Sequence, residues 1–153
     1  MSNHAAISFE TTLHVRDHCL CLAAQRAARK LARRFDEALK PAGITSGQFS
    51  LLMSLNRPEP PTVGAVANLL AMDRTTLTAN LKPLERRGMI ELVADTKDRR
   101  SRRIRLTEAG MAALNAAVPI WQDTHSDIDT RIGNDQTIAL RDGLRAVAQT
   151  DAL

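Results

Sequence analysis

The feature that most constrains the fold is a series of closely spaced helix starts in the middle of the chain. Thr45, followed three residues later by Gln48, fits a capping box at the start of an apolar segment. Thr62 and Asp73 can each cap a further helix. Only the short turn Ala71–Met72 separates these two helices. A short helix, a tight turn and a longer second helix form the outline of a helix-turn-helix.

Longer amphipathic segments flank this middle part. From about Asp17 to Lys40, and again from Thr107 to a break at Gly133–Asn134, apolar residues recur every three or four positions. Thr107 can cap the second of these segments. The seam of the second segment comprises Met111, Leu114, Val118, Trp121, His125, Ile128 and Ile132. Residues 1–15 show no clear period and are expected to form an arm. Because a lone subunit could not hide apolar seams at both ends, we expect the chain to pair with a second copy of itself.

A short hairpin is expected between these segments. The helix that begins at Asp73 extends to about Arg87 and ends at Gly88. Met89–Ala94 and Arg103–Leu106 have the pattern of two short strands. Ala and Leu abound and aromatic residues are scarce, which favours packed helices over sheets. With 153 residues, the chain is predicted to form a single, mainly α-helical domain with a small β-wing.

Positive charge is concentrated in the same region. Between Arg74 and Arg105 the chain has ten basic and four acidic side chains, a net charge of +6, whereas the whole chain carries only +4. So uneven a distribution is typical of proteins that bind a polyanion. On the helix that begins at Asp73, one side is an apolar stripe of Leu77, Leu81 and Leu84. The opposite side is small and basic, which suits a groove of double-stranded DNA. It comprises Thr75, Thr78, Ala79, Lys82 and Arg86.

Other classes of protein find little support. The four histidines are scattered, none stands at metal-ligand spacing with a cysteine, and there is no Gly-rich phosphate loop or nucleophile elbow. We therefore expect no catalysis and neither a metal nor another cofactor. The apolar stretch Cys19–Ala24 is too short for a signal sequence or a membrane span, and two cysteines make no disulfide framework. These features predict a cytoplasmic protein with reduced thiols and no membrane partner.

The stretch from Asp73 to Gly110 resembles the MarR (multiple antibiotic resistance regulator) family of bacterial winged-helix transcription factors. The matching motifs are Asp73–Thr78, Leu84–Ile90, the pattern Asp95-x-Lys97-Asp98-x-Arg100, and Ile104–Thr107 followed by Gly110. The likeness extends back through Gly43–Thr45 to Phe49 and so covers most of the chain. One departure is Lys97, where the family more often has arginine. Lysine keeps the charge but loses the planar fork.

The resemblance implies a homodimer that regulates transcription. Residues 17–41 and 108–150 would form the dimerisation helices, and residues 45–107 the winged helix-turn-helix part. The two winged parts would then occupy successive major grooves of a pseudo-palindromic operator. The protein is expected to act as a repressor that a small-molecule effector releases. A winged helix used only to bind other proteins is an alternative, but that role would not need so basic a wing.

Within the winged part, residue types indicate individual roles in binding DNA. Arg74 is the best candidate for a bidentate contact to guanine, or for a clamp on a phosphate. In the wing, Asp98 is expected to hold Arg100, which then reads the width of the minor groove. The remaining contacts, mostly to phosphates, are expected from Thr75, Thr76, Thr78, Lys82, Arg86, Lys97, Arg99, Arg102 and Arg103. The three threonines can also touch thymine methyl groups.

The two cysteines suggest a possible redox role. Cys21 falls where the hydroperoxide-sensing members of the family (the OhrR type) carry a reactive cysteine, and Cys19 lies just before it. Those members activate the cysteine with tyrosines, whereas this chain has no tyrosine. Three interpretations stay open: packed core residues, a redox sensor, or the lining of a ligand pocket. A disulfide between the two is not expected, since in one helix they point to different sides.

Apart from the thiols, the resemblance implies a small aromatic or carboxylated effector. Its site would lie between the dimerisation helices and the winged part, a common place for a pocket. Candidate lining residues are Arg26, Phe49, Met53 and Trp121. Packing in the protein core is the alternative role for these side chains.

Overall fold

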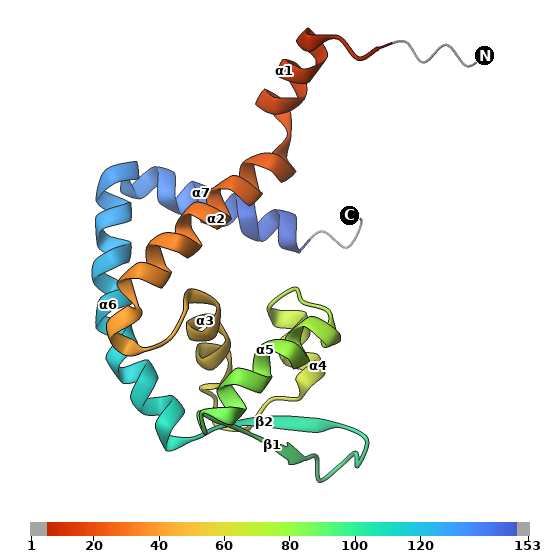
Figure 1. The fold of residues 1–153 in the computed structure, drawn as a ribbon, viewed down its shortest axis with the longest axis vertical. Coiled ribbons are helices and arrows are strands. Elements are labelled where there is room, and N and C mark those ends of the chain that lie inside the picture. Colours follow the sequence, from red (N-terminus) through yellow and green to blue (C-terminus); the bar gives the residue numbers. More distant parts are fainter. Residues whose placement is uncertain (1–5, 150–153) are drawn as a thin grey trace, which may run out of the picture. The chain divides into compact units, whose positions relative to one another are not determined.

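The computed structural model describes residues 6–149. Two compact units divide the chain between Arg34 and Phe35. The first unit contains α1 and most of α2, and the second contains the end of α2 and every later element (Figure 1). None of the described helices is long and apolar enough to span a bilayer.

α1 spans Phe9–His18 and lies in a segment for which the sequence predicted only an arm. Ser8 begins this helix, because its hydroxyl oxygen accepts a hydrogen bond from the amide of Thr11 at 3.1 Å. The described part of the expected arm is therefore largely helical, while residues 1–5 lie outside the description. No side chain of α1 is buried.

α2 spans Leu20–Ala38 and begins later than the sequence predicted. The helix expected from Asp17 is interrupted because the backbone of Cys19 is extended, with φ −78° and ψ 106°. The sulfur of Cys19 accepts a hydrogen bond from the amide of Leu22 at 3.4 Å, which caps the new helix. No side chain among residues 6–34 is buried, so the first unit has no core of its own.

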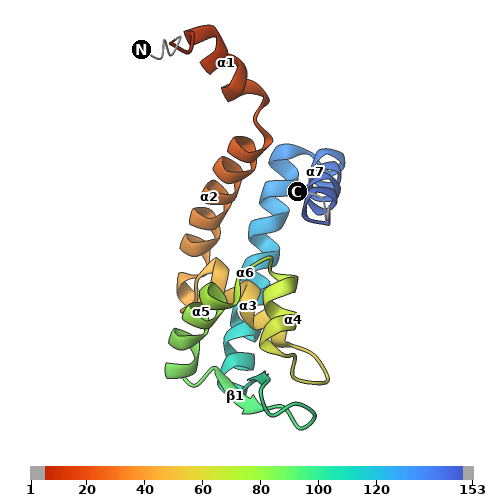
Figure 2. The same ribbon diagram turned by 90° about the vertical axis from the view of Figure 1, so that its right-hand side faces the viewer.

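The second unit is a helix-turn-helix followed by a hairpin and two further helices (Figures 1 and 2). Its elements are η1 (Lys40–Ala42), α3 (Ser46–Leu55), α4 (Val63–Leu69), α5 (Arg74–Arg86), β1 (Ile90–Ala94), β2 (Arg102–Leu106), α6 (Glu108–Ile132) and α7 (Asn134–Ala148). β1 and β2 pair antiparallel, with Ile90 opposite Leu106 and Ala94 opposite Arg102. This arrangement confirms the mainly α-helical fold with a small β-wing.

The four helix caps predicted from the sequence are confirmed. Thr45 and Gln48 form a reciprocal capping box at the start of α3, with hydrogen bonds of 3.1 and 3.2 Å. Thr62 caps α4, Asp73 caps α5 and Thr107 caps α6. In each case a side-chain oxygen accepts a hydrogen bond from a backbone amide in the first turn of the helix.

The core of the second unit is formed by α3, α4, α5, the hairpin and α6. Leu77, Leu81 and Leu84, the predicted apolar stripe of α5, are completely or almost completely buried. Large side chains elsewhere in the unit that are buried to a similar degree include Leu39, Leu52, Val66, Ile90, Ile104 and Leu114. The stripe therefore fixes which side of α5 faces away from the protein.

α6 meets the core with small residues near its start, because Gly110, Ala113 and Ala117 are buried there. A β-carbon on Gly110 would lie 2.2 Å from the carbonyl oxygen of Met89 and 2.6 Å from Cδ1 of Leu106. Both distances are far shorter than a van der Waals contact. Only glycine lets α6 approach the base of the hairpin so closely, which positions the hairpin relative to the core.

The predicted pairing seam of α6 is divided. Leu114 and Ile128 are buried in the core of the unit, whereas Met111, Trp121 and Ile132 are more than a third exposed. Four large apolar residues of α7 are about half exposed, namely Ile138, Leu140, Leu144 and Val147. The end of the chain therefore carries apolar surface that the subunit itself does not cover.

Candidate nucleic-acid interface

The outward side of α5 is the first part of the candidate interface. Opposite the buried stripe, every residue predicted for this surface is exposed: Thr75, Thr78, Ala79, Lys82 and Arg86. Arg74 and Thr76, in the first turn, are exposed as well. The side therefore presents hydroxyl, methyl and cationic groups, which are the groups that contact base edges and phosphates.

The first turn of α5 is fixed by Asp73. Its carboxylate accepts one hydrogen bond from the amide of Thr76 at 2.8 Å and one from the hydroxyl of Thr76 at 2.7 Å. These two contacts, the amide contact more than the hydroxyl contact, hold the pKa of Asp73 below its ordinary value. The ionised cap fixes the first turn of the helix and thereby the backbone of Arg74 and Thr75.

The three threonines of α5 differ in what their hydroxyl groups can still do. Thr76 donates its hydroxyl proton to Asp73, and Thr78 donates to the carbonyl oxygen of Arg74 at 2.7 Å. In the described part of the chain, the Thr75 hydroxyl has no hydrogen-bond partner. Thr75 therefore keeps a free donor, whereas Thr76 and Thr78 offer lone pairs and methyl groups. The sequence did not distinguish these three residues.

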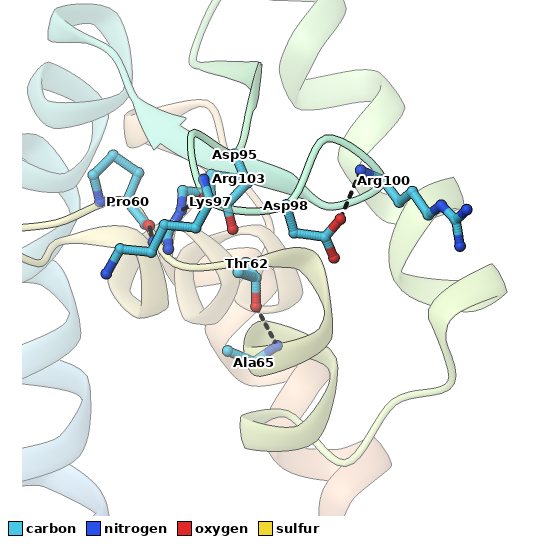
Figure 3. Close-up of polar contacts among 8 residues, drawn as sticks. All are labelled: Pro60, Thr62, Ala65, Asp95, Lys97, Asp98, Arg100 and Arg103. Atoms are coloured by element: carbon cyan, nitrogen blue, oxygen red, sulfur yellow. Dashed lines mark hydrogen bonds and ion pairs between the residues drawn. The ribbon is translucent and has the colours of Figure 1, made fainter.

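The wing is anchored at its base (Figure 3). Asp95, which follows β1, is buried, and its Oδ1 lies 3.1 Å from Nε of the half-buried Arg103 in β2. Arg103 also donates from Nη1 to the carbonyl oxygen of Pro60 at 2.7 Å. Next to it, the amide of Ile104 donates to the carbonyl oxygen of Pro61 at 2.9 Å. The hairpin is thereby attached to the segment that precedes α4.

Asp95 is ionised at neutral pH, so the wing base is held by a charged pair. The backbone amide of Lys97, 3.1 Å from Oδ1, lowers the pKa of Asp95 most, and the guanidinium of Arg103 lowers it further. From its residue type alone, Arg103 is predicted to contact phosphates. In the structure its guanidinium is bound to Asp95 and Pro60, which gives it a role in positioning the wing.

The wing loop, residues 95–101, turns at Asp98. Its Oδ1 accepts a hydrogen bond from the backbone amide of Arg100 at 2.9 Å. The sequence predicted that Asp98 holds the Arg100 side chain, but Figure 3 shows the guanidinium directed away from this carboxylate. The contact shapes the loop and leaves the guanidinium in solvent. Four wing cations are exposed, namely Lys97, Arg99, Arg100 and Arg102.

The ten basic side chains between Arg74 and Arg105 fall into two groups. Arg87, Arg103 and Arg105 bind oxygen atoms of the protein itself. The other seven are exposed, and they comprise Arg74, Lys82, Arg86, Lys97, Arg99, Arg100 and Arg102. All seven lie on α5 or on the hairpin. Folding therefore separates the cations that hold the scaffold from those available to a polyanion, a division that the sequence did not show.

The cysteines and Arg26 belong to the first unit. Both thiols are free, with Cys19 half-buried and Cys21 exposed, so neither belongs to the core of the subunit. The side-chain amide of Gln25 donates to the sulfur of Cys21 at 3.3 Å. Arg26 is exposed on α2. Cys21 is thus open to reagents near the start of a helix, whereas Cys19 has a capping role.

An aromatic cluster in the second unit contains two of the predicted pocket residues. The ring of Trp121 on α6 lies 6.2 Å from that of Phe49 on α3 and 4.6 Å from that of His125. His125 in turn lies 5.2 Å from Phe35, centroid to centroid. Met53, the third predicted residue of this unit, is exposed on α3. Phe35 and His125 were not predicted as pocket residues, although the spacing of His125 from Trp121 places both on one helix face.

Comparisons with known proteins agree with this geometry. Residues 44–101 match the MarR family. The organic hydroperoxide resistance transcriptional regulator of Bacillus subtilis (strain 168) is 33% identical over 101 residues, which cover 66% of this chain and 69% of the relative. MosR of M. tuberculosis, solved in complex with DNA, is 34% identical with a TM-score of 0.73, covering 86% of this chain and 99% of MosR. The transcriptional repressor CouR, bound to a 23-mer DNA duplex, is 29% identical with a TM-score of 0.78, covering 88% of this chain and 96% of CouR.

The chain therefore belongs to the MarR family of winged helix-turn-helix transcriptional regulators. Its relatives are regulators of transcription, and both solved structures named above hold DNA. In this chain, α4 and α5 form the helix-turn-helix, α5 is the recognition helix, and β1, β2 and the loop between them form the wing.

Proposed function

We propose that the protein is a sequence-specific regulator of transcription that acts as a homodimer on a pseudo-palindromic operator. The observation that carries the proposal is the exposure of seven cationic side chains on α5 and the hairpin, next to three that are bound internally. Exposed cations neutralise phosphates, and a helix beside a basic hairpin suits a groove and its flanking backbone. The protein would act in the cytoplasm, where bacterial DNA lies.

α5 would enter the major groove with its N-terminal end first. Arg74 is suited to a bidentate contact with O6 and N7 of guanine, and Thr75 offers its free hydroxyl to a neighbouring base edge or phosphate. Thr76 and Thr78 would present methyl groups to thymine, because their hydroxyl protons are engaged within the protein. The two basic residues further along, Lys82 and Arg86, would contact phosphates.

The wing would lie along the neighbouring minor groove. The contacts of Asp95 and Arg103 at its base fix where the loop begins and ends. Arg100, whose guanidinium is free of Asp98, would enter the groove and read its width. Phosphate contacts would come from Lys97, Arg99 and Arg102.

A second copy of the chain would cover the apolar residues that the chain ends leave exposed. In the described residues these comprise Ile7, Phe9, Val15, Leu20, Leu31, Ile132, Ile138, Leu140, Leu144 and Val147. Exposed apolar surface of this extent is unusual for a monomer. Two-fold pairing through residues 17–41 and 108–150 would bury the part of this surface that lies in those two ranges, from Leu20 onward. The pairing would also set the two recognition helices about 34 Å apart, one turn of DNA.

We further propose that the bound dimer represses transcription and that a small aromatic or carboxylated effector releases it. CouR is a transcriptional repressor, which supports the direction of control. The aromatic cluster around Trp121, with Phe49 and His125, offers rings on which a flat ligand can stack. Arg26 and Met53 are further candidates for the lining. The effector would act by favouring a dimer whose recognition helices are spaced wrongly for successive grooves.

The experiment that tests this proposal begins with genomic DNA fragments retained by the purified protein, which identify the operator. Fluorescence anisotropy then measures affinity for the operator and for an unrelated duplex. The operator is expected to bind at least about a thousandfold more tightly. Equal affinity for both duplexes would contradict sequence-specific regulation. No affinity for either would instead indicate a winged helix that binds only proteins.

A thiol-based redox sensor is a second candidate for the release step. The observation that favours it is the exposed Cys21 near the start of α2, in contact with Gln25. The Bacillus subtilis relative is named for resistance to organic hydroperoxides. Titration with an organic hydroperoxide should then abolish operator binding in the wild type and spare it in Cys21→Ser. If operator binding is unchanged, or if both cysteines are still free thiols after treatment, release by thiol oxidation is excluded.

A further inference from the structure

A glycine in α4 makes room for the first residue of α5. Gly64 is the second residue of α4, and Arg74 begins α5 on the other side of the tight turn. A β-carbon at position 64 would lie 2.9 Å from Nη2 of Arg74, 3.6 Å from its Cζ and 3.9 Å from its Nε. All three atoms belong to the guanidinium group. The planar end of Arg74 therefore lies against the bare backbone of Gly64.

The backbone of α4 does not itself require glycine at this position. The φ of Gly64 lies outside the left-handed region, so alanine is compatible with the helix and would favour it. A contact of 2.9 Å is nevertheless shorter than real β-carbons make, so a side chain at position 64 would displace the guanidinium. Because the end of a flexible side chain moves easily, this displacement costs the fold little. Gly64 thus controls the direction of the Arg74 side chain without controlling whether α4 and α5 fold.

We propose that Gly64 is a specificity-determining residue. The space that its missing side chain leaves lets the Arg74 guanidinium lie in the direction from which Arg74 reads a base edge. The inference rests on the proposed function, in which Arg74 contacts the operator. Bidentate reading of guanine requires two guanidinium nitrogens aligned with two acceptors, whereas a phosphate accepts a cation from many directions. A side chain at position 64, which displaces the Arg74 guanidinium, therefore lowers affinity for the operator more than affinity for unrelated DNA.

A double-mutant cycle tests this inference. The wild type, Gly64→Ala, Arg74→Ala and the double variant are titrated with the operator and with an unrelated duplex of equal length. Gly64→Ala is expected to weaken operator binding on the order of tenfold, less than Arg74→Ala does, and to leave binding of the unrelated duplex within about twofold. In the Arg74→Ala background, the same change at position 64 is expected to have no further effect, because no guanidinium is left to displace.

Gly47→Ala is the matched control. Gly47 is also the second residue of its helix, behind a threonine cap, but the nearest atom to a β-carbon there is the hydroxyl oxygen of Thr45 at 4.0 Å. The substitution and the helical position are the same, and the clash is absent. Operator binding of Gly47→Ala should match the wild type. Thermal unfolding should show Gly64→Ala at least as stable as the wild type, since alanine favours the helix.

The outcomes separate the inference from the function on which it rests. If Arg74→Ala binds the operator as the wild type does, the proposed role of Arg74 fails, and the role of Gly64 fails with it. If Arg74→Ala weakens binding but Gly64→Ala does not, only the inference is overturned. It is equally overturned if the loss caused by Gly64→Ala persists undiminished in the Arg74→Ala background.

Discussion

α5 and the wing loop both face away from the core, but different interactions hold them in place. α5 is fixed along its length by the buried side chains of Leu77, Leu81 and Leu84. In the wing loop, residues 96–100 are all exposed, and the main attachment is the pair of Asp95 and Arg103 at the base. The recognition helix therefore depends on the hydrophobic core, whereas the wing depends on a few polar contacts.

This difference separates stability from binding. A change in the leucine stripe acts on the whole fold, because several elements share that core. A change at the tip of the wing would remove a proposed contact to DNA and leave the core intact. Both kinds of change would weaken binding in a simple assay, so stability and affinity have to be measured side by side in each variant.

Leu81→Ala is expected to have the largest effect. It should lower the free energy of unfolding by about 2–5 kcal/mol, through lost burial and the cavity left behind. Denaturant titration followed by circular dichroism measures this loss. Lys82→Ala, at the next position but exposed, is the matched control and should change stability by less than about 0.5 kcal/mol. Similar losses in the two variants would show that the stripe does not anchor α5.

Arg100→Ala probes the tip of the wing. Operator binding is expected to weaken about ten- to hundredfold, equivalent to about 1–3 kcal/mol, while the unfolding temperature stays that of the wild type. Anisotropy titration and thermal unfolding measure the two quantities. Lys40→Ala, which removes an exposed cation of η1 outside the interface, should leave binding unchanged. If Arg100→Ala binds the operator with wild-type affinity, the Arg100 side chain does not contact the minor groove.

Asp95→Asn probes the base of the wing, and its effect on binding should be smaller than that of Arg100→Ala. The cations at the tip remain, but the charged contact with Arg103 that fixes the loop is lost. Asp98→Asn is the matched control, since an asparagine oxygen can still accept the hydrogen bond from the amide of Arg100. Hydrogen exchange of the wing's backbone amides should be faster in Asp95→Asn but not in Asp98→Asn, which would confirm that Asp95 and Arg103 hold the wing in place. Equal behaviour of the two variants would contradict it.

Acid should weaken the wing base and the helix cap. Because the pKa of Asp95 is lowered in the folded protein, its ionised form stabilises the fold. This stabilisation is fully present above the ordinary carboxyl pKa of 3.8 and is lost as the pH falls through the lowered value. Asp73 behaves in the same way at the start of α5. The unfolding temperature should therefore fall as the pH drops below about 4, and less steeply in Asp95→Asn. If the unfolding temperatures of the wild type and Asp95→Asn fall in parallel with pH, ionised Asp95 contributes nothing to the stability of the fold.

Ala71→Gly is expected to have the smallest effect. Ala71, in the turn between α4 and α5, has a φ of 50°, in the left-handed region that favours glycine. The substitution should raise the free energy of unfolding by up to about 1 kcal/mol and leave operator affinity unchanged. Ala79→Gly, the same change within α5, should instead lower it by about 1 kcal/mol. A loss of stability in both variants would argue against strain in the turn.

Features set by neighbours in the sequence could be predicted. Four helices begin where a polar residue was expected to cap them, namely Thr45, Thr62, Asp73 and Thr107. A cap contact joins residues only three positions apart, so the sequence alone contains it. The leucine stripe of α5 follows from helical spacing in the same way. Both strands end where they were predicted to end, and their predicted starts, Met89 and Arg103, are each within one residue of the observed ones.

Features set by long-range contacts could not be predicted. Arg103 and Pro60 lie far apart in the sequence, and nothing near Arg103 indicates that it anchors the wing rather than meeting phosphates. The seat that Gly64 provides exists only once α4 and α5 have folded against each other. The break at Cys19 was missed for another reason, because the apolar spacing of a helix continues through it.

The most direct measurement is the salt dependence of operator binding in the wild type and in the triple variant Lys97→Ala/Arg99→Ala/Arg102→Ala. Folding leaves these three cations exposed on the wing. Each lost phosphate contact should make the slope of log K against log salt shallower by about 0.9. The two wings of a bound dimer lose six contacts, a total of about 5.4, with the unfolding temperature unchanged. An identical slope in the two proteins would contradict the claim that the exposed cations of the wing neutralise operator phosphates.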